Sequence, residues 1–171
     1  LAFWAKVEAG EIPMRVTHND TKINNILFDK EGNVLCVIDL DTVMSAPALN
    51  DFGDAIRTYA NTGAEDATDL STVSLSLPMF AAYADGYLSQ QATTLNQAEL
   101  DHLAFSARYI TFEQVLRFLM DYINGDTYYK IKSPLHNLER THAQYALLQS
   151  IEAQYEAMCE VIKTTTAKYL A

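Results

Sequence analysis

The chain of 171 residues has the length of one ordinary globular domain. Hydrophobic residues make up 49% of it and charged residues 20%, which argues against a disordered or low-complexity chain. Asp and Glu outnumber Lys and Arg by 22 to 12, so we expect no nucleic-acid partner. No apolar run reaches the roughly 20 residues of a membrane helix, and no secretory signal is evident. The sequence therefore predicts a cytoplasmic protein without a membrane partner.

Both cysteines lie in apolar patterns, Cys36 in a strand-like run and Cys159 in a helical one. We expect both to be small buried hydrophobic residues, because a chain of this size needs no disulfide framework. Two cysteines are also too few for a metal site built on thiolates.

Short apolar runs near the start of the chain predict three strands, at residues 14–17, 25–28 and 34–38. The turn at 29–33 contains Gly and Asn and joins the last two strands as a hairpin. The third run is apolar at every position, which is typical of a strand buried on both faces.

Helical patterns fill the remainder, over about 50–59, from about 77, from about 94 to 124, and from about 137 towards the C-terminus. We see no internal repeat and no linker that would divide the chain. The predicted fold class is a mostly helical α+β domain, with a small β-hairpin unit over about residues 14–40 followed by a helical bundle.

The polar residues of the β unit form an ordered set. His18, Asp20 and Asn25 follow the first strand, and Asp39 ends the third strand, where the hairpin returns it to the loop that contains Asp20. In phosphoryl transfer, such a loop holds a carboxylate against the attacking hydroxyl, while a nearby amide oxygen binds a divalent cation on the phosphates. Asp20 fits the first role and Asn25 the second, with Asp39 as a second metal ligand.

Three stretches follow one another along the chain: HNDTKINN at 18–25, VIDLDTV at 37–43 and LNDFGDAIR at 49–57. In this order and spacing, the sequence resembles the aminoglycoside phosphotransferase and choline kinase superfamily, whose members share the protein-kinase-like fold. The wording of the stretches is most similar to sugar 1-kinases that act on N-acetylhexosamines. The resemblance extends from about Arg15 onward and implies a single domain, residues 1–171, that is the C-terminal lobe of this fold.

The resemblance also implies a role for each matching residue. Asp20 would be the catalytic carboxylate, Asn25 and Asp39 would bind Mg²⁺, and Asp51 would brace a helix start against the catalytic loop. His18 is expected to orient that loop by packing or hydrogen bonding.

Two further polar residues in the same segment have open roles. Lys22 occupies the place where many protein kinases have a lysine that contacts the transferred phosphate, and the alternative is a solvated turn lysine. Asp41 is either a further metal ligand or the cap of the following loop.

Arg117 lies inside the most apolar helix, and a buried arginine needs a partner. Glu113, four residues earlier, would supply an intrahelical ion pair. The alternative hypothesis is that Arg117, with Asp121 or with Tyr128 and Tyr129, lines an acceptor pocket and binds sugar hydroxyls.

The expected activity is transfer of the γ-phosphate of ATP, with Mg²⁺, to a hydroxyl of a sugar or amino alcohol. The narrower resemblance indicates the anomeric hydroxyl of an amino sugar. No glycine-rich loop or nucleotide-gripping lysine precedes His18, so we expect an N-terminal lobe to be missing and the isolated chain to be inactive.

Two other interpretations belong to different functional classes. Asp39-Leu40-Asp41 has the Asp-x-Asp pattern of haloacid-dehalogenase-type phosphatases, in which the first Asp is phosphorylated. That fold needs alternating strands and helices after the motif, whereas the downstream pattern here is helical. A lobe without its nucleotide clamp could also be a non-catalytic binding module.

Overall fold

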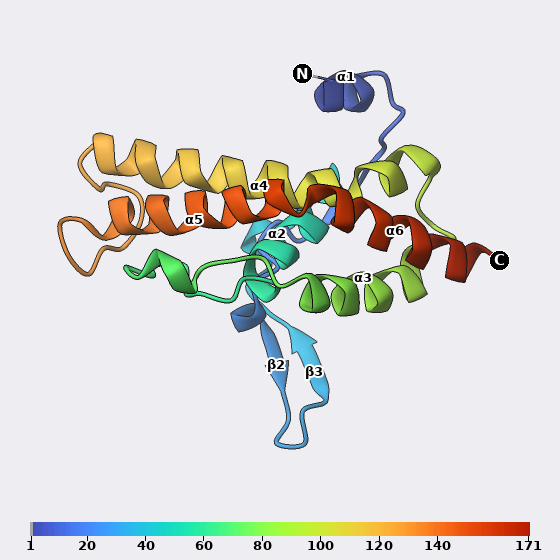
Figure 1. The fold of residues 1–171 in the computed structure, drawn as a ribbon, viewed down its shortest axis with the longest axis horizontal. Coiled ribbons are helices and arrows are strands. Elements are labelled where there is room, and N and C mark those ends of the chain that lie inside the picture. Colours follow the sequence, from blue (N-terminus) through green and yellow to red (C-terminus); the bar gives the residue numbers. More distant parts are fainter. Residues whose placement is uncertain (1) are drawn as a thin grey trace.

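The computed structural model describes residues 2–171 and combines a small β unit with a helical bundle (Figure 1). The strands are β1 (Met14–Thr17), β2 (Ile26–Phe28), β3 (Val34–Val37) and β4 (Met44–Pro47). The α-helices are α1 (Ala2–Glu8), α2 (Leu49–Tyr59), α3 (Leu77–Gln91), α4 (Gln97–Ile123), α5 (His136–Ala153) and α6 (Tyr155–Leu170). Three short 3-10 helices are η1 (Ile23–Asn25), η2 (Leu40–Thr42) and η3 (Leu70–Thr72). The predicted class, a mostly helical α+β fold with an early hairpin, is confirmed.

The four strands form two separate antiparallel pairs. The predicted hairpin is β2 and β3, with Ile26 opposite Val37. The first predicted strand, β1, pairs instead with β4, so that Thr17 lies opposite Met44. Because β1 and β4 pair, the polar segments that follow β1 and β3 come together at one end of this ladder.

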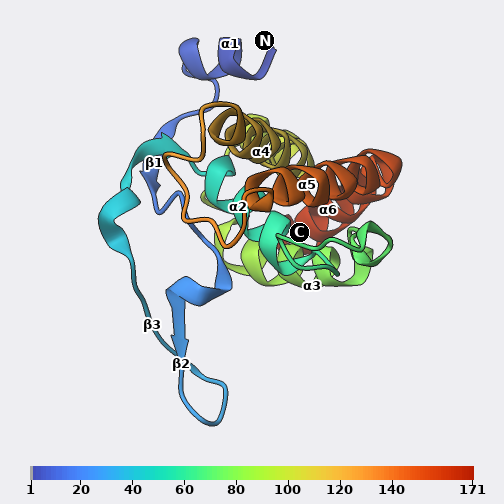
Figure 2. The same cartoon turned by 90° about the vertical axis from the view of Figure 1, so that its left-hand side faces the viewer.

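The helical bundle is centred on α2, which contacts both α3 and α4, while α5 runs alongside α4 and α6 lies against α3 (Figures 1 and 2). Leu49, Phe52 and Ile56 recur at spacings of three and four on α2, and all three are buried. α4 is one unbroken helix, whereas the predicted C-terminal helix is divided into α5 and α6 at Gln154.

Gly53 allows α2 and α4 to approach closely. A Cβ atom at this position would lie 2.5 Å from the backbone oxygen of Ser106 and 2.7 Å from Cγ1 of Ile110. A clash with backbone cannot be relieved by a rotamer change, so the helices would have to separate. Gly53 therefore determines how closely α2 packs against α4. α2 follows the candidate site in the sequence.

We expect Gly53→Ala to lower the free energy of unfolding by about 1–3 kcal/mol, the usual cost of overpacking. Gly86→Ala on α3 is the matched control, because a methyl group added there would meet nothing within 4 Å and the helix gains a better helix former. Urea unfolding of the two variants measures the difference. Equal stability of the two variants would contradict the close approach of α2 and α4.

The β2–β3 hairpin differs from the prediction in its burial. Val34 and Leu35 are 61% and 63% exposed, and every residue of β3 is exposed. Figures 1 and 2 show why: the hairpin projects away from the helical bundle. The prediction of a strand buried on both faces is therefore wrong for the chain as described, because an apolar run reports hydrophobicity and not the element that covers it.

Both cysteines are exposed, which also differs from the prediction. Cys36 lies on the projecting β3. Cys159 follows Met158 on α6, and one residue turns the side chain by about 100° around a helix. Because Met158 is the residue that faces the core, Cys159 points elsewhere.

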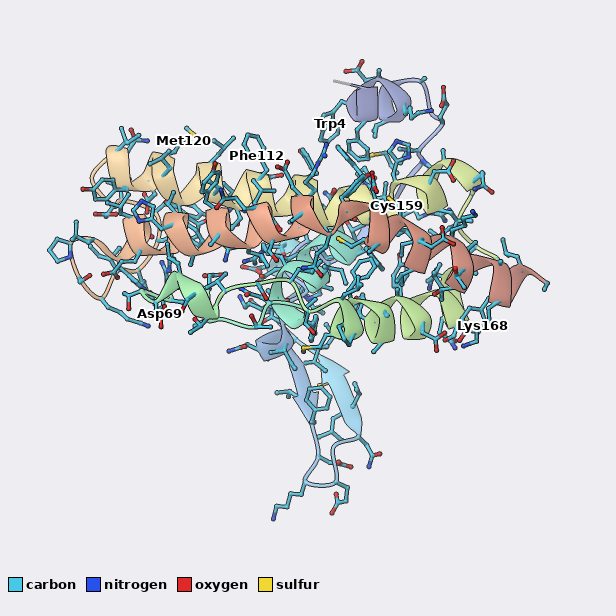
Figure 3. All side chains as sticks on the ribbon, in the orientation of Figure 1. Trp4, Asp69, Phe112, Met120, Cys159 and Lys168 are labelled. Atoms are coloured by element: carbon cyan, nitrogen blue, oxygen red, sulfur yellow. The ribbon has the colours of Figure 1, made fainter. Side chains whose placement is uncertain are left out.

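α4 also exposes apolar side chains on one face. Phe112, Leu116 and Met120 are exposed at intervals of four residues, and Figure 3 shows Phe112 and Met120 on the side of α4 turned away from α5. Val115 and Phe118 form the buried side of the same helix.

Within residues 2–171, none of the helices combines the length and apolar composition that a transmembrane span requires.

Candidate active site

The loop between β1 and η1 is held in place by Asp51 on the first turn of α2. The two carboxylate oxygens of Asp51 accept hydrogen bonds from the backbone N–H groups of His18 and Asn19, at 2.9 and 2.7 Å. Asn19 has a φ of 61°, a left-handed conformation that asparagine tolerates better than most residues. Asp51 thus ties the start of the loop to the helical bundle, which is the place that the sequence analysis assigned to it as a brace.

Asp20, Lys22 and Asn25 converge within this loop. Oδ2 of Asp20 accepts hydrogen bonds from Nζ of Lys22 at 2.6 Å and from Nδ2 of Asn25 at 2.9 Å. Nζ of Lys22 also lies 3.9 Å from Oδ2 of Asp39, so the ammonium stands between two carboxylates. Among the described residues, Oδ1 of Asp20 makes no hydrogen bond and is free to accept one.

The surroundings of Lys22 stabilise its charged form. Burial alone would lower the pKa of this ammonium group, but the hydrogen bond and negative charge of Asp20 outweigh it, with further contributions from Asp39 and Asp54. The pKa of Lys22 therefore lies above its ordinary value. The lysine is a fixed positive charge in the loop, in contrast to the alternative of a freely solvated turn lysine.

The hairpin brings Asp39 beside Asn25. The backbone N–H of Ile38 donates to the backbone oxygen of Asn25 at 2.9 Å, and Asp39 is the next residue. Asp39 has a φ of 63°, a left-handed conformation of the kind that clusters at functional sites. Since Nδ2 of Asn25 is used by Asp20, the oxygen of the Asn25 amide is the atom left for a ligand.

His18 and Asp41 differ in how firmly they are held. Nε2 of His18 lies 3.0 Å from the backbone oxygen of Ile38 and must donate to it, and Thr42 donates to the backbone oxygen of His18 at 2.6 Å. His18 thereby connects the loop to the end of the hairpin. Asp41 is exposed on η2 and makes no hydrogen bond to another described residue, so its side chain does not act as a cap.

A buried ion network lies beneath the loop. Asp54 on α2 accepts a hydrogen bond from the backbone N–H of Thr21 at 2.7 Å through Oδ2. Its Oδ1 accepts from Nε and Nη2 of Arg57, and Nη1 of Arg57 donates to Glu65 at 2.8 Å. Asp54 and Arg57 are both buried, so this network anchors the loop to the interior of the bundle.

A cavity of about 320 Å³ lies between the loop and the end of α4. Asp20 and Lys22 line one side of it, and Arg117, Tyr128 and Tyr129 line another. The guanidinium carbon of Arg117 lies 6.0 and 5.8 Å from the ring centres of Tyr128 and Tyr129. The structure therefore brings Arg117 and both tyrosines to the same cavity as Asp20.

The premise that Arg117 is buried is wrong. Its side chain is exposed, and no ion pair with Glu113 lies within 4 Å in the described part of the chain. The apolar pattern around Arg117 combines buried residues such as Val115 and Phe118 with exposed ones such as Leu116, so it does not place Arg117 in the core. Arg117 lies on the side of α4 that lines the cavity. Stacking on the tyrosines takes the place of the expected intrahelical ion pair.

Asp121 does not line this cavity. Its carboxylate accepts hydrogen bonds from the backbone N–H groups of Thr127, Tyr128 and Tyr129 at 2.8–3.0 Å, and from the side chain of Asn137. Burial alone would raise the pKa of Asp121, but the three backbone hydrogen bonds outweigh it, so the pKa lies below its ordinary value. Asp121 therefore positions the loop that contains Thr127, Tyr128 and Tyr129, called the tyrosine loop below. Both of its oxygens are occupied and none is free for a sugar hydroxyl, which corrects its assignment as a substrate-binding residue.

The family model of the phosphotransferase enzyme family matches residues 1–93, which is more than half of the chain. The chain belongs to the phosphotransferase enzyme family. The matched range contains the loop with Asp20, the hairpin, Asp39 and the whole of α2. The phosphatase interpretation of Asp39-Leu40-Asp41 gains no support, since both sheets among the described residues are antiparallel pairs.

Enzymes of the kinase type use a nucleotide and a divalent cation, and the oxygens of this phosphotransferase suit Mg²⁺. Asn25 contributes an amide oxygen and Asp39 a carboxylate, the hard ligands that Mg²⁺ prefers. No group of three or more His, Cys, Asp or Glu suited to a metal occurs in residues 2–171. A site with only two protein ligands is nevertheless sufficient for Mg²⁺, because this ion is usually bound by one or two carboxylates together with substrate phosphates and water.

The sequence analysis missed several side chains of this phosphotransferase site. Asp54 stands in the third matching stretch, and Arg57 follows it at a spacing of three, which on a helix indicates an ion pair. Glu65, Gln114 and Thr42 complete the cavity walls. Thr42 lies in the second matching stretch, whereas Glu65 and Gln114 carry no signal in the sequence, because they reach the site through tertiary packing.

Proposed function

We propose that the chain is the acceptor- and metal-binding lobe of an ATP-dependent kinase, which phosphorylates the anomeric hydroxyl of an N-acetylhexosamine. The observation that carries the proposal is the shared cavity: a carboxylate and a lysine of the loop face the same space as an arginine and two tyrosines. Family membership supports a phosphotransferase, and the three matching sequence stretches support the sugar acceptor.

In this proposal, the free Oδ1 of Asp20 accepts a hydrogen bond from the acceptor hydroxyl and orients its oxygen towards the γ-phosphorus. The hydrogen bonds from Lys22 and Asn25 fix the other oxygen of the carboxylate. Lys22 supplies positive charge beside the transferred group, where charge develops in the transition state. Bound between Asn25 and Asp39, Mg²⁺ would neutralise charge on the phosphate oxygens.

The far wall of the cavity suits a sugar. Tyrosine rings offer flat apolar faces with hydroxyls at their ends, and a guanidinium offers several donors. Asp121 holds the backbone of the tyrosine loop from below, so Tyr128 and Tyr129 are positioned before an acceptor arrives. Positioning of this kind contributes most of the catalysis in phosphoryl transfer.

The proposed nucleotide-clamping lobe would cover the projecting hairpin. An exposed apolar hairpin is unfavourable in water, and exposed patches of this kind mark interaction sites. Calorimetry with MgATP tests this part: we expect the 171-residue chain alone to bind far more weakly than a protein that also carries such a lobe. Micromolar binding by the chain alone would show that no further lobe is needed.

The acceptor is tested by a screen of the full-length gene product. N-acetylhexosamines, plain hexoses, choline and aminoglycosides are compared by acceptor-dependent consumption of ATP. We expect the highest kcat/KM with an N-acetylhexosamine. Activity confined to choline or an aminoglycoside would contradict the proposal of a sugar acceptor but not the proposal of a phosphotransferase.

Arg117→Ala is expected to raise the KM for the acceptor by about 10-fold, which corresponds to the loss of about 1.4 kcal/mol of binding. The melting temperature should stay unchanged, because Arg117 is exposed and makes no ion pair with a described residue. Arg108→Ala is the matched control, since Arg108 also lies on α4 over two aromatic rings, Phe105 and Tyr155, but outside the cavity. A lower melting temperature with an unchanged KM would reduce Arg117 to a structural role.

A further inference from the structure

A second polar cavity adjoins the first. It has a volume of about 380 Å³ and lies between η1, the end of α2, the following loop and α5. Lys22, Arg57 and Glu65 line both cavities, so the two spaces meet at these three side chains. A ligand with its reacting hydroxyl at Asp20 would have to pass these side chains to reach the second cavity.

Gln144 of α5 lines the second cavity and has an unpaired donor. The side chain is completely buried, and its Oε1 lies 3.4 Å from Nη1 of Arg57, from which it accepts. This contact assigns the oxygen and leaves Nε2 as the donor end, which is buried and has no acceptor among the described residues. Leaving a buried donor unpaired is unfavourable, so Nε2 of Gln144 would gain from an acceptor. A ligand in the second cavity supplies one when the Gln144 amide turns towards it, because Gln144 belongs to the wall of that cavity.

The charges of this cavity favour a neutral ligand group. The guanidinium of Arg57 is already paired with Asp54 and Glu65, each at 2.8 Å, and Lys22 is paired with Asp20. Among the described lining residues, no uncompensated positive charge is left for a phosphate or a carboxylate. The side-chain amides of Asn24 and Asn61 add polar walls without charge.

We infer that the second cavity receives the acyl-amide group of the acceptor, and that Nε2 of Gln144 donates a hydrogen bond to its carbonyl oxygen. An amide carbonyl is neutral and is a strong acceptor, which are the two properties that the cavity requires. The inference rests on the proposed sugar kinase function and deepens it. Gln144 becomes the residue that distinguishes an N-acylated sugar from a plain hexose.

Saturation-transfer NMR on the 171-residue chain tests the inference without requiring phosphoryl transfer. N-acetylglucosamine and glucose are the two probes. With the wild-type chain, we expect the acetyl methyl protons to receive the strongest saturation. We also expect N-acetylglucosamine to bind about 10-fold more tightly than glucose, the usual effect of one good hydrogen bond in a site built for it.

Two substitutions remove the donor in different ways. Gln144→Glu keeps an oxygen for Arg57 but replaces the N–H donor by a second oxygen, and Gln144→Met removes the polar end without adding charge. Both are expected to lose the preference for N-acetylglucosamine, with glucose binding unchanged. Gln149→Glu, at an exposed position of the same helix, is the control and should behave as the wild type.

Wild-type binding without a preference would overturn the inference, and so would a preference retained by both variants. In the second case, Nε2 of Gln144 serves a buried water only. Turnover by the full-length protein separates this result from the proposed function. If the full-length protein phosphorylates sugars but shows no preference for the amide, the inference about Gln144 is wrong and the kinase function stands. If the preference is intact but no sugar is phosphorylated, the kinase function is wrong and the inference about binding stands.

Discussion

Asp20→Asn is expected to reduce turnover of the full-length enzyme by at least about 10³-fold, within the range that a positioned proton acceptor contributes. Asparagine has nearly the same shape, but its amide is neutral and a poor acceptor for the proton of the attacking hydroxyl. Because Lys22 and Asn25 both donate to Oδ2 of Asp20, the amide oxygen of the asparagine takes that place and its NH2 group occupies the position of Oδ1, where a donor cannot accept a hydrogen bond from the attacking hydroxyl. The variant should therefore lose the orientation of the acceptor together with the charge.

Nucleotide binding by Asp20→Asn should stay within about 3-fold of the wild type, since the proposed phosphate and metal contacts lie on other residues. Steady-state kinetics with calorimetry of MgATP gives both quantities. Asp101→Asn, at an exposed position of α4, controls for the loss of one carboxylate from an acidic chain. Near-normal turnover in Asp20→Asn would remove Asp20 from the role of catalytic carboxylate.

The loop of the candidate site is predictable from the sequence because its residues lie close together in the chain. Asp20, Lys22 and Asn25 fall within one short segment, so one tight loop brings their side chains into contact. Asp39 is distant, but a hairpin has a register, and the turn at 29–33 places the end of β3 beside the start of β2. Local geometry and strand pairing are therefore sufficient to bring these four residues together.

The acceptor side of the site is less predictable, since it depends on which helix lies opposite the loop. Arg117 follows an apolar pattern that suggests burial, yet the pattern does not say which face of α4 is covered. The same limitation hides Gln144, which is 87 residues from its partner Arg57. Periodicity predicts that α4 and α5 are helices, but their rotation about their own axes is decided by packing against the rest of the bundle.

Strand β4 and the burial of the hairpin mark two further limits. The sequence Met44-Ser45-Ala46-Pro47 is short, ends in proline and lacks alternation, so it carries little strand signal. It becomes a strand because β1 offers a free edge to pair with. The apolar residues of β3 show the converse. They give a clear strand signal, but the sequence of the strand does not determine which element, if any, covers it.

Arg57→Met is expected to have the largest effect on stability, a loss of about 3–5 kcal/mol, because it leaves a buried carboxylate uncompensated. Asp54 would retain its negative charge in a site with little access to water, and Glu65 would lose its nearest cation. Since Asp54 also holds the backbone N–H of Thr21, the strain should reach the loop that carries Asp20. Urea unfolding measures the loss, and a reduced kcat in the folded fraction would show the effect on the loop.

Lys132→Met is the control for Arg57→Met, because it breaks an ion pair of similar length, 2.6 Å to Asp66, with a lysine that is largely exposed. Exposed pairs contribute about 0–1 kcal/mol, so this variant should be nearly as stable as the wild type. The double variant Asp54→Asn, Arg57→Met removes the stranded charge and should recover part of the loss. Equal effects of Arg57→Met and Lys132→Met would mean that the network beneath the loop is solvated, and that the loop containing Asp20 does not depend on it.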